Sequence, residues 1–297
     1  MISHLFKLTI ILFFLFTQSI NATQKLTSNH VYSEALALKK AIDKLNKNMN
    51  IGRIQPIELS NTQPLHVYAI TTALNEKVAI LFIKSGVTHF QRTDFPNEEI
   101  QPKHVYQLIK TVQKNIKTLF PNIKFENKGN KEKHPADVLR MLVASNLILD
   151  ELITQKLTPK YPFLVVQNLK DNLRIALKKE KKEIPIIHYE AYAHVEPRDV
   201  FINAQNLFAT LANTAHLKFG IEYPKRPYYI PLNEDDIKPS HVFTVTIINQ
   251  ILLKDLFRRN GFSFVHPLAL SAKMPITPAH VYAAYEEALL LTLFFIM

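Results

Sequence analysis

The sequence predicts an all-α protein of about eight helices, stacked as irregular repeats and joined by proline-bounded loops. First, a short phrase, written most plainly as Gln-Pro-Lys-His-Val-Tyr at 101–106, recurs seven times. Second, each copy is followed by apolar residues at the three- and four-residue spacing of one helix face. Third, the chain has 5 Gly, 17 Pro and no Trp. That composition suits helices joined by proline-containing loops better than a hairpin-rich β fold.

The recurring phrase is interpreted as a helix start. Proline at the first helical position has a suitable φ and lacks the N–H that would be unpaired there. The first copy has Ser28 in place of this proline. The residue two positions later is His or Asp, and we expect it to accept a hydrogen bond at the helix start. These positions are His30, His66, His104, Asp137, Asp199, His241 and His280.

A shared metal or ligand site at these seven positions is the alternative. Ligands of one metal site usually lie a few residues apart, whereas successive copies are separated by 33 to 62 residues. The positions could converge only if their helices pointed the same way. The sequence therefore favours a structural role at helix starts, with no metal, cofactor or catalytic residue assigned.

The helices are expected in order from the copies of the phrase. Seven of them lie within 23–48, 64–85, 102–120, 135–156, 197–218 and 239–260, and from 278 onward. An eighth, at 161–182, has the helical pattern but carries no recognisable copy, and it ends in a run of Lys and Glu. Most separations are near 36 to 42 residues, the range of helical repeats that bury a continuous core by stacking.

A polar segment at 127–133 is the best candidate for a boundary. It would divide the chain into helical repeats at 23–126 and at 134–297, with one continuous domain as the alternative. The apolar end at 288–297 is too short to span a membrane unless the whole helix from Val281 is counted. It is interpreted as part of a buried terminal helix or as the end of a chain cut short.

Residues 1–22 are interpreted as a secretory signal peptide. Lys7 precedes an apolar run at 8–16, polar residues follow, and Ala22 offers a cleavage point before Thr23. A retained N-terminal anchor is the alternative. We therefore expect an exported protein, periplasmic or secreted. The chain has no cysteine, so no disulfide stabilises it although an exported compartment would permit one.

The formal net charge of +11 favours anionic partners such as lipid headgroups or acidic glycans. The basic residues are scattered along the chain, which is also typical of an ordinary solvated surface. Nucleic acid is not expected as a partner of an exported chain.

Two segments are candidate ligand surfaces. In the first, His188, Glu190 and His194 alternate, so an extended chain would place them on one face. They could bind a metal ion only with help from another element. In the second, Lys225, Arg226 and Tyr228 combine cations with an aromatic ring, which suits sugars or phosphates. Phosphate loops and the Gly-x-Ser-x-Gly and His-Glu-x-x-His motifs are absent from the sequence.

These observations favour a non-catalytic binding or scaffold module whose partner is another envelope or secreted protein. One alternative is a hydrolase of an envelope polymer that uses the 188–196 loop, with Glu190 or Glu196 as general acid or base. Another is a polyanion binder, whose affinity would fall steeply with salt.

Overall fold

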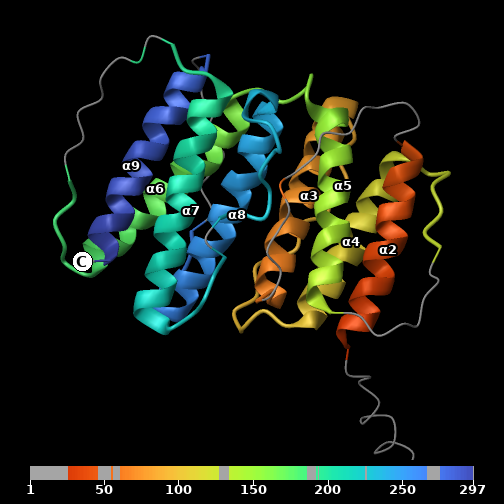
Figure 1. Ribbon diagram of the computed structural model, residues 1–297, viewed down its shortest axis with the longest axis horizontal. Helices are drawn as coiled ribbons and strands as arrows, with labels where there is room; N and C mark the ends of the chain where they lie inside the picture. The colour runs from red at the N-terminus through yellow and green to blue at the C-terminus, as the bar shows by residue number, and fades with distance from the viewer. Residues whose placement is uncertain are drawn as a thin grey trace, which may run out of the picture.

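The computed structural model describes residues 26–45, 55, 61–126, 134–185, 192, 194–224, 226–265 and 275–296. In this part of the chain there are eight α-helices and no strand, so the predicted all-helical fold is confirmed (Figure 1). The helices are α2 (Ser28–Leu45), α3 (Pro64–Ser85), α4 (Pro102–Leu119), α5 (Pro135–Ile153), α6 (Lys160–Lys179), α7 (Pro197–Phe219), α8 (Pro239–Arg259) and α9 (Pro278–Ile296). A single 3₁₀ turn, η1 (Glu234–Asp236), precedes α8.

The eight helices pack as two groups of four with the same arrangement. In the first group, α4 and α5 each pack against both α2 and α3. In the second, α8 and α9 each pack against both α6 and α7, so the pairings repeat in chain order. The candidate boundary predicted at 127–133 lies outside the described residues, and α5, which follows it, packs with α2 and α3. The change of group falls at 154–159.

All four helices of a group run in the same direction, because their starts meet at one end. The starts of the first group line a small apolar hollow formed by Ser28, Val31, Pro64, Val67, Pro102, Val105, Pro135 and Val138. Those of the second group line an equivalent hollow formed by Pro159, Pro162, Pro197, Val200, Pro239, Val242, Pro278 and Val281. The proline and the valine of the phrase therefore pack the end of each bundle.

Parallel helices explain the long connections. The segment between α3 and α4 must return along the full length of the bundle. The segment 86–101 has sixteen residues and can reach about 50 Å when extended, whereas α3 is about 33 Å long. Proline-bounded extended loops suit this return because they resist folding into helix.

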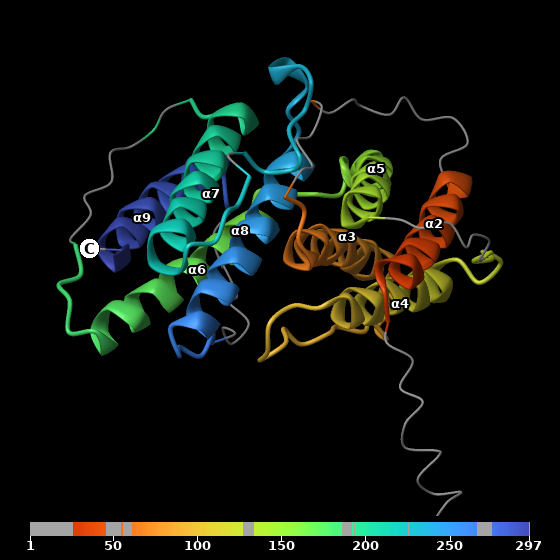
Figure 2. The ribbon, with the colours of Figure 1, turned by 60° about the horizontal axis from the view of Figure 1, so that its bottom comes forward.

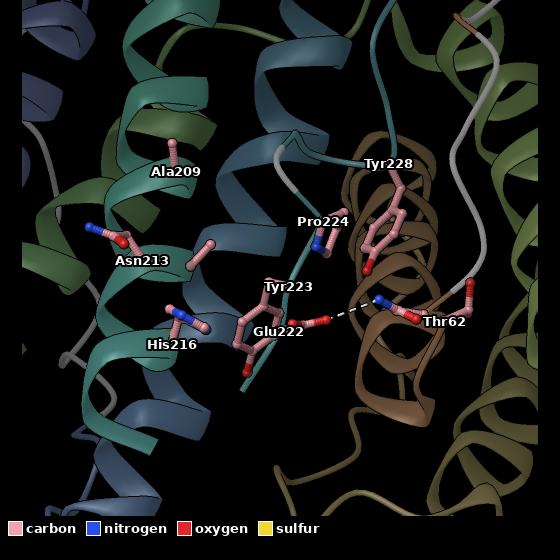
Figure 3. Close-up of a pocket in the computed structure, with 10 residues that line it drawn as sticks. Thr62, Ala209, Asn213, His216, Glu222, Tyr223, Pro224 and Tyr228 are labelled. Atoms are coloured by element: carbon pink, nitrogen blue, oxygen red, sulfur yellow. Dashed lines mark hydrogen bonds between the residues drawn. The ribbon is translucent and has the colours of Figure 1, made fainter. Parts of the chain in front are cut away.

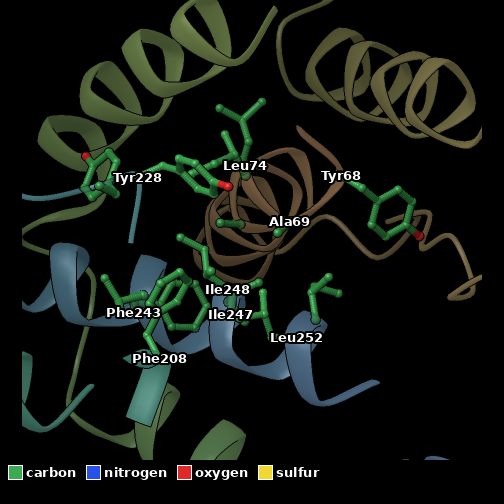
Figure 4. Close-up of a cluster of buried hydrophobic side chains, with 14 of the residues drawn as sticks. Tyr68, Ala69, Leu74, Phe208, Tyr228, Phe243, Ile247, Ile248 and Leu252 are labelled. Atoms are coloured by element: carbon green, nitrogen blue, oxygen red, sulfur yellow. The ribbon is translucent and has the colours of Figure 1, made fainter. Parts of the chain in front are cut away.

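The link between the groups is too short to return along α5. Helix α6 must therefore begin near the end of α5 and run in the opposite direction. Residues 154–159 can reach only about 20 Å, less than the length of α5. The second group therefore runs opposite to the first, and the two are joined mainly where α3 packs on α8 (Figure 2). In Figure 4, Ala69 on α3 lies beside Ile248 and Leu252 of α8 in this junction.

Helix α6 begins with an eighth, altered copy of the phrase, Thr-Pro-Lys-Tyr-Pro-Phe at 158–163. The Tyr161 N–H donates to the Thr158 carbonyl at 3.2 Å, as the His66 N–H donates to the Gln63 carbonyl at 3.0 Å. Pro162 takes the place of the valine in the apolar end of the bundle. This copy escapes recognition in the sequence because Tyr and Pro replace the His and Val that define the others.

Helix α9 is the one helix in the described part of the chain that has the length and composition to cross a membrane. In the structure it packs against α6 and α7, and Tyr285, Leu291 and Phe295 are fully buried. Leu290 and Leu293 are exposed on its other side.

Candidate functional site

A hollow with a volume of about 530 Å³ lies beside α7. Its lining comes from α7, from the segment 222–228 that follows it, and from two residues just before α3 (Figure 3). The lining residues are Asn61, Thr62, Ala209, Ala212, Asn213, His216, Glu222, Tyr223, Pro224 and Tyr228. We call it the tyrosine hollow.

A second hollow of about 310 Å³, here called the arginine hollow, adjoins the first at Ala209. It is lined by Gln55, Arg198, Phe201, Ile202, Gln205, Asn206, Ala209, Arg226, Pro227, Ile230, Pro231 and Ile237. Together the two hollows follow one face of α7 from Arg198 to His216. The eighteen helical steps from residue 198 to residue 216 rise about 27 Å, so the combined feature, here called the α7 groove, is elongated along the helix.

The lining of the groove combines neutral hydrogen-bonding side chains with a similar number of apolar ones. Carboxamides from α7 line the groove at Gln205 and Asn206 and, about two turns later, at Asn213, and Asn61 adds another from the opposite wall. Each carboxamide can both donate and accept hydrogen bonds. Phe201 lies 1% exposed beneath the side chains of the arginine hollow. Such a surface can recognise the backbone of an extended chain.

Two tyrosines of the tyrosine hollow are held from behind by His66. The His66 ring lies 5.4 Å from the Tyr223 ring and 4.9 Å from the Tyr228 ring, centroid to centroid. The Tyr223 hydroxyl donates to an Asp255 carboxylate oxygen at 3.3 Å. Arg258 and Arg259 bind the same carboxylate. The helix start of α3 and the end of α8 thus fix one wall of the hollow.

His66 is fully buried, and burial lowers its pKa from 6.5 to about 3 despite the opposing charge of Asp255. Its Nδ1 accepts the Gln63 N–H at 3.0 Å, which places the remaining ring proton on Nε2. The ring is therefore neutral at physiological pH and acts as a packing element between the two tyrosines.

A buried polar cluster lies deeper in the junction between the groups. The Lys77 Nζ is 2.7 Å from an Asp150 carboxylate oxygen, and both side chains are almost completely buried. Burial raises the pKa of Asp150 and lowers that of Lys77, and their mutual attraction opposes both shifts. Lys77 also lies 5.0 Å from the Tyr229 ring centroid. Burial, aided by Lys77, lowers the pKa of His241 to about 3. The cluster holds α3, α5 and α8 together and does not line either hollow.

The seven residues of the helix-start phrase share one local interaction. In each copy the side chain accepts a hydrogen bond from the backbone N–H three residues earlier. The donors are Thr27 to His30, Gln63 to His66, Gln101 to His104, His134 to Asp137, Glu196 to Asp199, Lys238 to His241 and Thr277 to His280, at 2.9–3.2 Å. His104 Nε2 also lies 3.0 Å from Glu98.

The candidate ligand surfaces from the sequence are only partly within the described residues. His188, Glu190 and Lys225 lie outside them. His194 is exposed and lines neither hollow. Arg226 lines the arginine hollow and Tyr228 lines the tyrosine hollow. Of the described residues in these two surfaces, the structure places Arg226 and Tyr228 in the groove but not His194.

The sequence did not single out the α7 residues that form the other wall. Gln205, Asn206, Asn213 and His216 fall at helical spacing on the face of α7 that also carries Ile202, Ala209 and Ala212. That periodicity was available as a signal, but a polar face is ordinary on a helix surface. Asn61 and Glu222 come from loops, and their 3.2 Å hydrogen bond across the hollow has no sequence signature.

No protein-family model matches the chain, and no curated protein or solved structure matches it. Within the described residues no group of three or more His, Cys, Asp or Glu side chains is placed to hold a metal ion. Glu196, a candidate acid or base in the hydrolase alternative, lies exposed at the start of α7 and outside the lining of both hollows.

Proposed function

We propose that the protein is an exported, non-catalytic binding module that holds an extended polypeptide segment of another envelope or secreted protein in the α7 groove. The observation that carries this proposal is that two hollows, both lined by Ala209, follow each other along about 27 Å of one helix. At roughly 3.3 Å per extended residue, a segment of about eight residues would span it. A compact small ligand would need only one of the two hollows.

The chemistry of the walls supports a peptide occupant. The carboxamides of Gln205, Asn206 and Asn213 offer donors and acceptors that match the backbone N–H and C=O of an extended chain. The opposite wall already makes such a contact within this protein. The Gln55 N–H donates to the Ile230 carbonyl at 2.8 Å, which is a backbone pairing between two separate segments beside the arginine hollow.

Export of the chain rests on the signal-like character of residues 1–22, which lie outside the described residues. An exported binding protein meets unfolded or extended segments of other envelope proteins, and its positive charge attracts acidic ones. Localising a tagged full-length chain by cell fractionation tests this part of the proposal. Recovery in the cytoplasm with an intact N-terminus would contradict it.

The binding proposal is tested by selecting eight-residue peptides from a random display library on the full chain and measuring their affinity by fluorescence anisotropy. Ala209 is exposed where the two hollows meet, so Ala209→Trp is expected to obstruct the groove. Selected peptides should bind this variant at least about tenfold more weakly than the unmodified chain.

Leu217→Trp provides the matched control. Leu217 is 65% exposed on the same helix and lines neither hollow, so the added ring should leave peptide affinity unchanged. The proposal would be wrong if no peptide were selected, or if both tryptophan variants weakened binding equally. Thermal melts of the two variants confirm that any difference arises at the groove.

A further inference from the structure

The tyrosine hollow differs in charge from the rest of this basic protein. It contains one carboxylate, Glu222, and no Lys or Arg among its described lining residues, although the chain carries 36 Lys and Arg against 25 Asp and Glu. The arginine hollow at the other end of the groove has the opposite character, with Arg198 and Arg226. The two ends of one groove therefore favour opposite charges.

The hydroxyl group of Tyr228 lacks a hydrogen-bond partner among the described residues, although the side chain is only 3% exposed. Burial raises its pKa, so the hydroxyl stays neutral. In Figure 3 this hydroxyl points toward the side of the hollow where Glu222 and Thr62 lie. A buried polar atom without a partner is costly, and a ligand that donates a hydrogen bond would remove that cost.

The hollow also presents two aromatic rings in fixed positions. His66 packs against both Tyr223 and Tyr228, and Asp255 accepts a hydrogen bond from the Tyr223 hydroxyl. Rings that are already held lose little conformational freedom when a ligand binds. A cation beside aromatic rings and a carboxylate gains both cation–π and ionic attraction. His216 is the other titratable group of the lining and is exposed.

We propose that the tyrosine hollow is a subsite for a basic side chain, lysine or arginine, with Glu222 as its counter-ion and the Tyr228 hydroxyl oxygen as a hydrogen-bond acceptor. This inference rests on the proposed function of the α7 groove, because the basic residue belongs to the bound segment. It also gives that segment a direction. Its basic residue lies toward the His216 end of α7, and acidic groups lie toward Arg198 and Arg226.

The first test uses a selected eight-residue peptide that contains one lysine or arginine, which is replaced by norleucine. The replacement keeps most of the apolar stem and removes the charge, and affinity for the full chain should fall about tenfold. Tyr228→Phe and Glu222→Gln should each weaken the basic peptide about fivefold and leave the norleucine peptide unchanged. Equal binding of the two peptides would overturn the subsite while leaving the groove intact.

Two control variants make the same substitutions, tyrosine to phenylalanine and glutamate to glutamine, at residues outside the groove. Tyr106→Phe removes a hydroxyl on α4, and Glu126→Gln removes a carboxylate near the end of α4. Neither residue lines the groove, so both should preserve the preference for the basic peptide. A similar loss in these controls would show that overall charge or stability causes the effect, which would also overturn the subsite.

A second probe separates failure of the subsite from failure of the groove. N-acetyl-lysine N-methylamide carries the basic side chain without a peptide long enough to span α7. Saturation-transfer NMR should detect its binding to the full chain and a weaker signal with Tyr228→Phe. If no peptide binds but this probe does, the peptide-binding proposal fails, while the affinity of the tyrosine hollow for a basic side chain is retained. Absence of a signal from the probe would overturn the subsite.

Discussion

Helices α3 and α7 are the second helices of the two groups, and they occupy equivalent places in opposite surroundings. Both begin with the phrase, as Pro-Leu-His-Val-Tyr-Ala at 64–69 and Pro-Arg-Asp-Val-Phe-Ile at 197–202. Sixteen of the 22 residues of α3 are buried, against ten of the 23 residues of α7. The difference arises because α8 of the second group covers α3, whereas the corresponding face of α7 borders the groove.

One equivalent pair shows what this difference teaches. Ala69 on α3 is completely buried, while Ile202 at the same position of α7 is 43% exposed. The larger apolar side chain is therefore the more exposed one. Close approach of α3 to α8 requires a small residue, and the open face of α7 places no such limit. Residue hydrophobicity alone would assign the two faces the wrong way round.

The largest effect on stability expected from this contrast is at the buried ion pair between Lys77 of α3 and Asp150 of α5. Asp150→Ala leaves the buried Lys77 without its counter-charge and should lower the free energy of unfolding by about 3–5 kcal/mol. Urea titration monitored by circular dichroism measures this. Asp43→Ala removes an exposed partner of Lys39 on α2 and should cost no more than about 0.5 kcal/mol. Similar losses in both variants would contradict the burial argument.

Exchanging the equivalent residues gives a second, smaller effect. Ala69→Ile adds atoms to the packed junction of α3 with α8 and should destabilise the protein by about 1–3 kcal/mol. Ile202→Ala removes an exposed side chain and should change stability by less than about 0.5 kcal/mol. Both values come from the same urea titration. If Ile202→Ala were the more damaging change, α7 would not be the open helix.

The third effect is a pH dependence of the free energy of unfolding that arises from His66 at the start of α3. The start of α7 has Asp199 at the equivalent position and therefore lacks this histidine. Because the pKa of His66 is about 3 in the fold, the unfolded chain takes up its proton first as pH falls below about 6.5. Stability contributed by neutral His66 is therefore present above pH 6.5 and is lost toward pH 3. Lowering the pH from 7.5 to 5.5 should therefore reduce the free energy of unfolding by about 1.4 kcal/mol through this single group.

His66→Asn removes this titration and keeps a side-chain oxygen that can accept the Gln63 N–H. The variant should lose about 1.4 kcal/mol less than the unmodified chain over the same pH interval, whatever its stability at pH 7.5. His194→Asn removes one exposed histidine for comparison. An unchanged pH slope in His66→Asn would show that the buried ring does not carry the effect.

Much of the fold follows from local sequence. Seven helix starts were recognisable because a proline (Ser28 in the first copy), an acceptor such as His104 and a following valine act within one helical turn. The start of α6 was missed because Tyr161 and Pro162 make a similar turn with different side chains. The parallel course of the helices was left open, since the phrase fixes where a helix begins but not which neighbours share its end.

The sequence predicted only a few of the residues that line the candidate site. Arg226 and Tyr228 stood out because cations and aromatic rings in one short loop suggest a ligand surface by composition. Asn61, Asn213 and Glu222 could not be joined to them, because they lie on separate elements that meet only when the second group folds against α3. Their individual residue types are ordinary for exposed positions.

By itself, the sequence determined that the chain is helical and where most helices begin, because capping and helical periodicity depend on residues a few positions apart. Tertiary structure alone decided that the helices form two parallel groups of opposite direction, that Ala69 is buried and Ile202 exposed, and that a groove runs along α7. These features depend on distances between segments that are far apart in the chain. No local propensity encodes such distances.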